Sequence, residues 1–257
     1  MSGQATPESP ARAAYDAFAG CYDEFNHAYM YERWTRRLLE RAQANGLRGD
    51  RLLDVGCGTG LSFLPMLERG WRVTGCDISA GMLEQARAKA GEGVELAVAD
   101  MRELPVFGQF DLIWAVNDAL NYLLSAAEFE ATLRGMRRNL APGGRIVFDI
   151  NTLTAYRSFW SGEHVIENGG KRFLWQGGEA GEVAYEGFFE ARFGGDGEAH
   201  VHRQRHFPPA AVLPLVEAAG LRCLDLAATV DGELDDELDE DVHTKAVYVL
   251  ALAERSK

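Results

Sequence analysis

The first 150 residues alternate between short apolar runs and longer stretches whose apolar residues recur at helical spacing. Five runs predict buried strands: RLLDVG (51–56), WRVTGCDIS (71–79), VELAVADM (94–101), FDLIWAV (110–116) and GRIVFDI (144–150). Residues 11–44 and the segments GLSFLPMLERG, SAGMLEQARAKAG and AAEFEATLRGMRRNL predict helices, with Pro65 in a first turn and Ser79 as an N-cap. Strands that alternate with helices predict an α/β fold, a doubly wound Rossmann-like sheet with parallel strands.

The pattern changes after Asn151. From Glu163 to Phe207, apolar and charged residues alternate with period two between glycine-rich turns, which predicts a small antiparallel sheet with one buried face. A helix near 208–219 and two last strands, LRCLDLAATV and HTKAVYVLALAE, return to the first pattern. The acidic segment between these strands, DGELDDELDE, is more typical of a solvated loop than of a cation or basic-partner site. We expect a flexible tail (1–12), a Rossmann-like domain with an N-terminal helical cap (13–152 and 208–257) and an inserted antiparallel sheet (153–207).

Composition narrows the class of protein. The 257 residues are 47% hydrophobic and 25% charged, which is typical of a globular domain. A net charge of −13 disfavours a protein that neutralises phosphates, so we expect no nucleic-acid partner. No apolar run approaches the roughly 20 residues that cross a bilayer, and MSGQATPESPAR lacks the apolar core of a signal peptide. Four dispersed cysteines without a C-x-x-C pair indicate reduced thiols, and we therefore expect a soluble cytoplasmic protein with no membrane partner.

The segment LLDVGCGTGLSF forms a glycine-rich turn between the first predicted strand and the helix after it. A phosphate-binding loop requires Lys and then Ser or Thr after its last glycine, but Leu61 and Ser62 stand there. A dinucleotide motif starting at Gly56 requires glycine at position 61. The spacing G-x-G-x-G after Asp54 instead suits an amino-acid moiety, whose ammonium group an acid and backbone carbonyls can hold.

Acidic residues also end the next two predicted strands. Asp77 ends GCDIS, where a carboxylate can accept hydrogen bonds from both hydroxyls of a ribose; a helix-capping role is the alternative. Asp100 in VADM can accept from an exocyclic amine, and Met101 offers a polarizable contact to an aromatic ring. Since ligands of this architecture bind at the carboxyl ends of the strands, the three acids predict one nucleoside-binding edge.

LDVGCGTG, GCDIS and VADM, in this order, resemble the cofactor motifs of the class I S-adenosylmethionine-dependent methyltransferases. The resemblance runs from about Tyr15 to the C-terminus and implies a seven-stranded sheet whose last strand is antiparallel. It implies that the glycine turn and Asp54 hold the methionine part of S-adenosylmethionine, Asp77 the ribose, and Asp100 with Met101 the adenine. The cofactor-binding residues that it implies are Tyr15, Tyr22, Trp34, Asp54, Gly56, Cys57, Gly58, Gly60, Asp77, Ile78, Met82, Asp100, Met101 and Asn117.

Two further segments resemble a narrower group, the small-molecule methyltransferases with a β-sheet insertion. YDAFAGCYDEFNHAYMYERW would fold over the cofactor, with Tyr22 and Trp34 facing its methionine end; ordinary helix packing is the alternative for both. NDALNYL follows the fourth strand and would place Asn117, Asp118, Asn121 and Tyr122 nearest the reaction. Asn121 equally suits a cap or a loop-fixing role.

The acceptor of the methyl group leaves a weaker signal, because alignment supplies most of the rate of methyl transfer. Candidate catalytic residues are Asp118, which could orient or deprotonate an amine, and His202 and Arg205, which match an insertion pattern of the group. On an ideal strand His202 and Arg205 point to opposite faces, so at most one faces the pocket. His200, His202 and His206 share a face but lack a fourth metal ligand, and we expect no metal.

An inserted sheet above the cofactor edge would cover the acceptor. Tyr156 and Trp160 precede it and, with Asn121 and Tyr122, are candidates for binding a small, partly apolar organic molecule. We expect a small organic acceptor with an N, O or C nucleophile, as in secondary metabolism. A tRNA or protein methyltransferase, or a protein that binds S-adenosylmethionine without turnover, remains an alternative. The sequence leaves the acceptor and the oligomeric state open.

Overall fold

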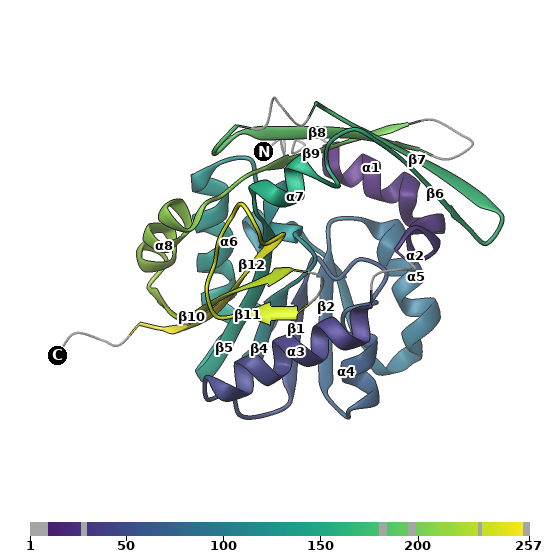
Figure 1. Ribbon diagram of the computed structural model, residues 1–257. Helices are drawn as coiled ribbons and strands as arrows, with labels where there is room; N and C mark the ends of the chain where they lie inside the picture. The colour runs from purple at the N-terminus through teal and green to yellow at the C-terminus, as the bar shows by residue number, and fades with distance from the viewer. Residues whose placement is uncertain (1–9, 27–29, 180–183, 195–198, 231–232, 254–257) are drawn as a thin grey trace, which may run out of the picture.

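The computed structural model describes residues 10–26, 30–179, 184–194, 199–230 and 233–253. At its centre lies an eight-stranded sheet with the order β11-β10-β12-β5-β4-β1-β2-β3 (Figure 1). The strands are β1 (Arg51–Val55), β2 (Arg72–Asp77), β3 (Glu95–Val98), β4 (Phe110–Ala115), β5 (Leu140–Asn151), β10 (Leu221–Val230), β11 (Glu233–Asp235) and β12 (Lys245–Leu252).

The predicted fold class is confirmed. Strand β1 pairs in parallel with both β2 and β4, which brings the ends of these strands to one edge. Strand β12 runs antiparallel to β5 and β10, as expected for the last strand. The sheet has one strand more than the seven that were predicted: β11, a strand of three residues, extends the sheet beyond β10. It arises within the acidic segment, where the sequence pattern predicts only a loop.

Helices cover both faces of the large sheet. α3 (Tyr31–Ala44), α4 (Leu64–Glu68) and α5 (Ala80–Ala90) bury apolar residues on one face, while α6 (Ala126–Asn139) and α8 (Pro209–Ala218) bury theirs on the other. Pro65 lies in the first turn of α4, and the Ser79 hydroxyl accepts from the Met82 amide at the start of α5, as predicted. No helix in the described ranges is long and apolar enough to cross a membrane.

The second sheet consists of β6 (Glu163–Asn168), β7 (Lys171–Gly177), β8 (Phe188–Gly194) and β9 (His200–Arg205), which pair antiparallel in chain order. Figure 1 shows this sheet across the top of the molecule, with α1 (Pro10–Phe18) and α7 (Leu153–Arg157) between it and the large sheet. A buried aromatic cluster joins α1 and α2 (Tyr22–Phe25) to β7 and β8. Four 3₁₀ turns complete the described elements: Ala19–Cys21, Gly91–Gly93, Met101–Glu103 and Ala119–Tyr122.

Two expectations about polar segments need correction. α1 begins at Pro10, so residues 10–12 belong to a helix; the rest of the predicted tail, 1–9, lies outside the described residues. The acidic segment is more than a solvated loop, because its described part forms ion pairs with basic residues of other elements. Three arginines lie on one face of α3: Arg33 and Arg37 pair with Glu233, and Arg41 pairs with Asp236 and also with Asp225 of β10.

Candidate active site

The glycine turn lies directly after β1. Gly56 and Gly58 have φ angles of +73° and +54°, in the left-handed region that favours glycine. A Cβ on Gly56 would stand 3.2 Å from the Ala119 Cβ, and both residues line a cavity at this edge. Gly60 has a different role, because a Cβ there would lie 2.6 Å from the Phe63 ring. The first two glycines let the backbone form a cavity wall, whereas Gly60 accommodates core packing.

The cavity holds about 970 Å³ of empty space, including the part open to solvent. It lies at the carboxyl ends of the parallel strands, beneath α1. The structure brings twelve of the predicted site residues together in its wall: Tyr15, Tyr22, Gly56, Cys57, Gly58, Asp77, Ile78, Met82, Asp100, Met101, Asn117 and Tyr122.

Asp77 is fixed at the end of β2 by backbone donors. Its carboxylate accepts hydrogen bonds from the amides of Gly58 at 2.8 Å and Ser79 at 2.9 Å. Burial raises the pKa of Asp77, and these hydrogen bonds oppose the rise. The hydroxyl of Ser79, rather than the carboxylate of Asp77, caps α5. The Asp77 carboxylate lines the cavity and can still accept hydrogen bonds from a ligand there.

Asp100 is held by Arg102. The guanidinium and backbone amide of Arg102 donate to the carboxylate, with a shortest contact of 2.6 Å. Burial by itself would raise the pKa of Asp100, but the hydrogen bonds from Arg102 outweigh it and keep that pKa below its usual range. The carboxylate is therefore a charged acceptor on the cavity wall, beside Met101.

Asp54 lies behind the cavity wall. It is fully buried and accepts from the Ser62 hydroxyl at 2.5 Å, while Ser62 itself lines the cavity. Burial raises the pKa of Asp54 to about 7, and the hydrogen bond from Ser62 opposes the rise. Asp54 thus holds the side chain of Ser62, a cavity residue that the sequence pattern did not single out.

Trp34 does not reach the cavity, contrary to its predicted place at the methionine end. Its ring is buried in the core beside Leu38, on the face of α3 that packs on the large sheet. Tyr31, three residues earlier on the same helix, lines the cavity instead. The Tyr31 hydroxyl accepts from the Asn117 side chain at 3.0 Å and lies 3.3 Å from the Tyr22 hydroxyl. Helical spacing from Trp34 could have revealed Tyr31.

Asn117 and Asp118 follow β4 in a strained turn. Both have positive φ angles, +59° and +54°, which non-glycine residues rarely adopt. The Asp149 carboxylate accepts from both of their amides, at 2.7 and 3.1 Å, and holds the turn. Backbone strain of this kind is typical of ligand-binding positions.

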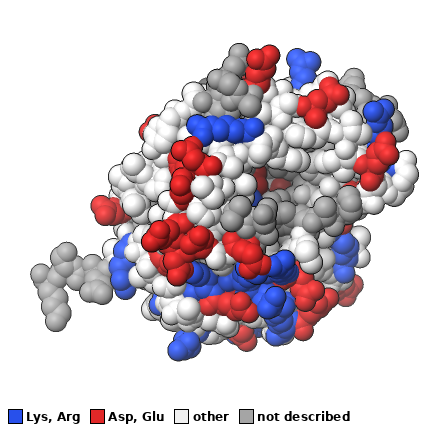
Figure 2. All heavy atoms as spheres, viewed as in Figure 1, with Lys and Arg blue, Asp and Glu red and all other residues white. Residues whose placement is uncertain are grey.

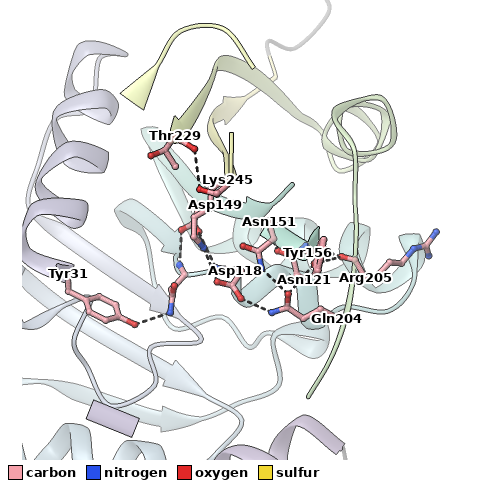
Figure 3. Close-up of polar contacts among 12 residues, drawn as sticks. Tyr31, Asp118, Asn121, Asp149, Asn151, Tyr156, Gln204, Arg205, Thr229 and Lys245 are labelled. Atoms are coloured by element: carbon pink, nitrogen blue, oxygen red, sulfur yellow. Dashed lines mark hydrogen bonds and ion pairs between the residues drawn. The ribbon is translucent and has the colours of Figure 1, made fainter. Parts of the chain in front are cut away.

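The Asp118 carboxylate is not part of the cavity wall. Figure 3 shows it between Lys245 and Gln204, which donate to it at 2.8 and 2.6 Å. The Lys245 ammonium also contacts Asp149 at 2.7 Å. This arrangement makes Asp118 part of a charged cluster in which two carboxylates share one ammonium.

His202 and Arg205 lie on opposite sides of β9, as expected. His202 is buried, and its Nδ1 lies 2.9 Å from the hydroxyl of Tyr122 in the cavity wall. Arg205 points elsewhere, since its guanidinium donates to the Leu124 carbonyl at 3.2 Å and approaches Glu186 at 3.7 Å. Neither His202 nor Arg205 lines the cavity. The described residues contain no group of His, Cys, Asp or Glu suited to a metal ion.

The other acceptor candidates also lie behind the cavity wall. Asn121 fixes the loop, because its side chain accepts from the Asn151 amide and donates to the Arg205 carbonyl, both at 2.9 Å. Tyr156 donates to Gln204 at 3.1 Å, and Trp160 packs in the aromatic cluster. Tyr122 is therefore the one of these candidates that contacts the described cavity.

Comparison with known proteins agrees with this geometry. The profile of a methyltransferase domain family matches residues 52–144. YqeM, a putative methyltransferase of Bacillus subtilis (strain 168), is 31% identical over 206 residues, covering 76% of this chain and 81% of the relative. A solved S-adenosylmethionine-dependent methyltransferase of Clostridium acetobutylicum aligns with a TM-score of 0.76 over 93% of this chain and 99% of its own, at 21% identity. The sugar N-methyltransferase KedS8 of Streptoalloteichus sp aligns with a TM-score of 0.67 over 99% and 96% of the two chains, at 23% identity. The chain belongs to the class I S-adenosylmethionine-dependent methyltransferases, with S-adenosylmethionine as its cofactor.

Proposed function

We propose that this methyltransferase acts on a small organic acceptor. The observation that carries the proposal is the position of the small sheet and α1, which cover one end of the cavity. Tyr15 of α1 and Tyr122 line this end, and both contact His202 of β9. An enclosed, aromatic end suits a small molecule better than a folded macromolecule. The name of KedS8, a sugar N-methyltransferase of similar fold, also supports a small acceptor.

The cavity residues fit the three parts of S-adenosylmethionine. We assign the ribose to Asp77, whose carboxylate is already fixed by two amides, and the adenine to Asp100 and Met101. The methionine part would lie against the Gly56–Gly58 turn, with Ser62, Tyr31 and Asn117 around its polar end. The Cβ that Gly56 lacks would narrow this part of the wall.

Bound S-adenosylmethionine supplies a methyl group on a positively charged sulfur, and its transfer to an acceptor lone pair returns the S–C electron pair to sulfur. The residues of the chain then contribute alignment and exclusion of water, which account for most of the rate of such a transfer. Asn117, fixed between Tyr31 and Asp149, would orient the donor end, and the phenols of Tyr15 and Tyr122 would bound the acceptor.

Surface charge supports a small acceptor over a tRNA. Figure 2 shows a central hollow on this face, with acidic and basic side chains intermingled around it rather than a continuous basic surface. The net charge of −13 agrees with this, since binding to phosphate chains requires clustered Lys and Arg.

The test is transfer of an isotopically labelled methyl group. The purified protein is incubated with labelled S-adenosylmethionine and, separately, a metabolite extract, bulk tRNA or total protein. We expect label in the metabolite fraction, with the acceptor identified by its mass shift. Label found only in tRNA or protein would refute the small acceptor. If the protein binds the cofactor but no fraction takes up label, a non-catalytic role is favoured.

A further inference from the structure

Tyr122 and His202 form a hydrogen-bonded pair where the cavity meets the small sheet. Tyr122 lines the cavity, and its hydroxyl lies 2.9 Å from Nδ1 of His202. The ring of Tyr15, another cavity residue, contacts both rings edge-on, at 5.4 and 5.3 Å between centroids. The pair therefore has one member in the cavity wall and one behind it.

His202 has an apolar environment. Its side chain is 3% exposed, and the rings of Phe18, Trp175 and Phe193 lie between 6.1 and 6.3 Å from its own. Burial lowers the pKa of His202 to about 4, with a smaller contribution from His200. The surroundings of His206 are different, because this buried side chain lies 3.2 Å from the carboxylate of Glu240. His202 is thus neutral at physiological pH and a poor proton acceptor.

The neutral ring carries one N–H and one bare nitrogen. Nε2 of His202 is buried and has no hydrogen-bond partner among the described residues. The rings of Phe18, Trp175 and Phe193 pack around this side chain, and an N–H can make a weak hydrogen bond to an aromatic ring that a nitrogen lone pair cannot make. Protonation of Nε2 is therefore favoured, which leaves Nδ1 to accept and makes the Tyr122 hydroxyl the donor.

We propose that Tyr122, with its proton directed to His202, presents its oxygen lone pairs to the acceptor and selects a nucleophile that carries hydrogen, an N–H or O–H group. The inference rests on the proposed function and narrows its substrate class. A nucleophile that donates its N–H or O–H to Tyr122 still has a lone pair free to attack the methyl carbon. The new N–C or O–C bond forms as the S–C bond breaks with its electrons on sulfur, and the nucleophile's proton leaves to water. His202 is a positioning residue in this scheme.

The first test reads the pair directly and needs no acceptor. In the full chain with ¹⁵N-labelled histidine and bound S-adenosylmethionine, NMR should show His202 with a protonated Nε2 and a bare Nδ1 from pH 5.5 to 8. Tyr122→Phe keeps the ring, should shift the Nδ1 resonance and thereby assigns it. A proton on Nδ1, or titration of His202 between pH 6 and 7, would overturn the proposal.

The second test uses the acceptor found by the labelling experiment. His202→Asn keeps an acceptor near the Nδ1 position and should retain kcat within about threefold, whereas His202→Leu and Tyr122→Phe should each lower kcat about tenfold or more. The KM for S-adenosylmethionine should change little, and the double variant should be no worse than Tyr122→Phe.

A catalytic base at position 202 would give a different result. It would make His202→Asn as inactive as His202→Leu and would remove an ionisation from the pH profile of kcat; that result, or a methyl group found on carbon, overturns the proposal. Absence of methyl transfer would refute the proposed function instead, while the NMR measurement still decides the state of the pair.

Discussion

The cofactor side and the acceptor side of the active site are built differently. On the cofactor side, residues close in sequence help to fix the two acids assigned to the nucleoside: the Ser79 amide donates to Asp77 two positions away, and Arg102 does the same for Asp100. On the acceptor side the partners are remote, since Lys245 and Asp118 are 127 positions apart and His202 and Tyr122 are 80 apart. The nucleoside end of the cofactor side is thus encoded in local motifs, whereas the acceptor side is assembled by the fold.

The largest effect is expected where the remote contacts concentrate charge. Lys245→Met removes the ammonium shared by Asp118 and Asp149, and leaves Asp149, which is fully buried, beside a second carboxylate. Removal of one member of a buried charge cluster costs about 3 kcal/mol or more, and we expect a loss of this size in the free energy of unfolding, measured with urea. Arg72→Met, in an exposed pair with Asp50, should cost less than about 1 kcal/mol. Equal losses in the two variants would show that the cluster does not hold the acceptor side.

The buried acid on the cofactor side gives a pH-dependent effect of comparable size. Because the folded-state pKa of Asp54 is raised from 3.8 to about 7, the folded protein retains a proton there that the unfolded chain loses near pH 4. The contribution of Asp54 to stability is therefore fully present at low pH and falls as pH rises through 7. Relative to Asp54→Asn, the wild type should lose up to roughly 4 kcal/mol of unfolding free energy between pH 4 and 8. If denaturation experiments gave the same difference in unfolding free energy between wild type and Asp54→Asn at every pH in this range, the raised pKa would be refuted.

Local contacts should determine cofactor affinity. Asp77→Asn removes the charged acceptor assigned to the ribose hydroxyls, so the dissociation constant for S-adenosylmethionine, measured by calorimetry, should rise about 30-fold. Asp50→Asn, at an exposed position before β1, is the matched control and should leave the constant unchanged. A similar constant in Asp77→Asn would place the ribose elsewhere.

The smallest effect separates two aromatic residues of α3. Tyr31→Phe removes a hydroxyl that Asn117 donates to in the cavity wall and should weaken cofactor binding about threefold. Trp34→Phe, one helical turn later in the core, should lower stability but change the cofactor dissociation constant less than twofold. The opposite order of binding effects would restore Trp34 to the methionine end.

Much of the cofactor side was predictable because each of its motifs is a strand end followed by a turn. Asp77, Asp100 and the glycines at 56 and 58 reach the cavity as expected, since the carboxyl ends of parallel strands meet at one edge. Asp54 and Trp34 were predicted to contact the cofactor, but both side chains lie behind the cavity wall. A motif identifies a turn or a helix face, whereas the packing around it decides whether a side chain reaches the ligand or supports the residue that does.

Short-range periodicity and turn chemistry specify the α/β alternation, the small antiparallel sheet and the cofactor motifs, so these could be predicted from the chain alone. The folded molecule was needed to show that Lys245 and Gln204 hold Asp118, that His202 contacts Tyr122, and that part of the acidic segment pairs with α3. Such contacts join residues 80 or more positions apart. No local pattern records them, because they depend on how the two sheets and their helices pack.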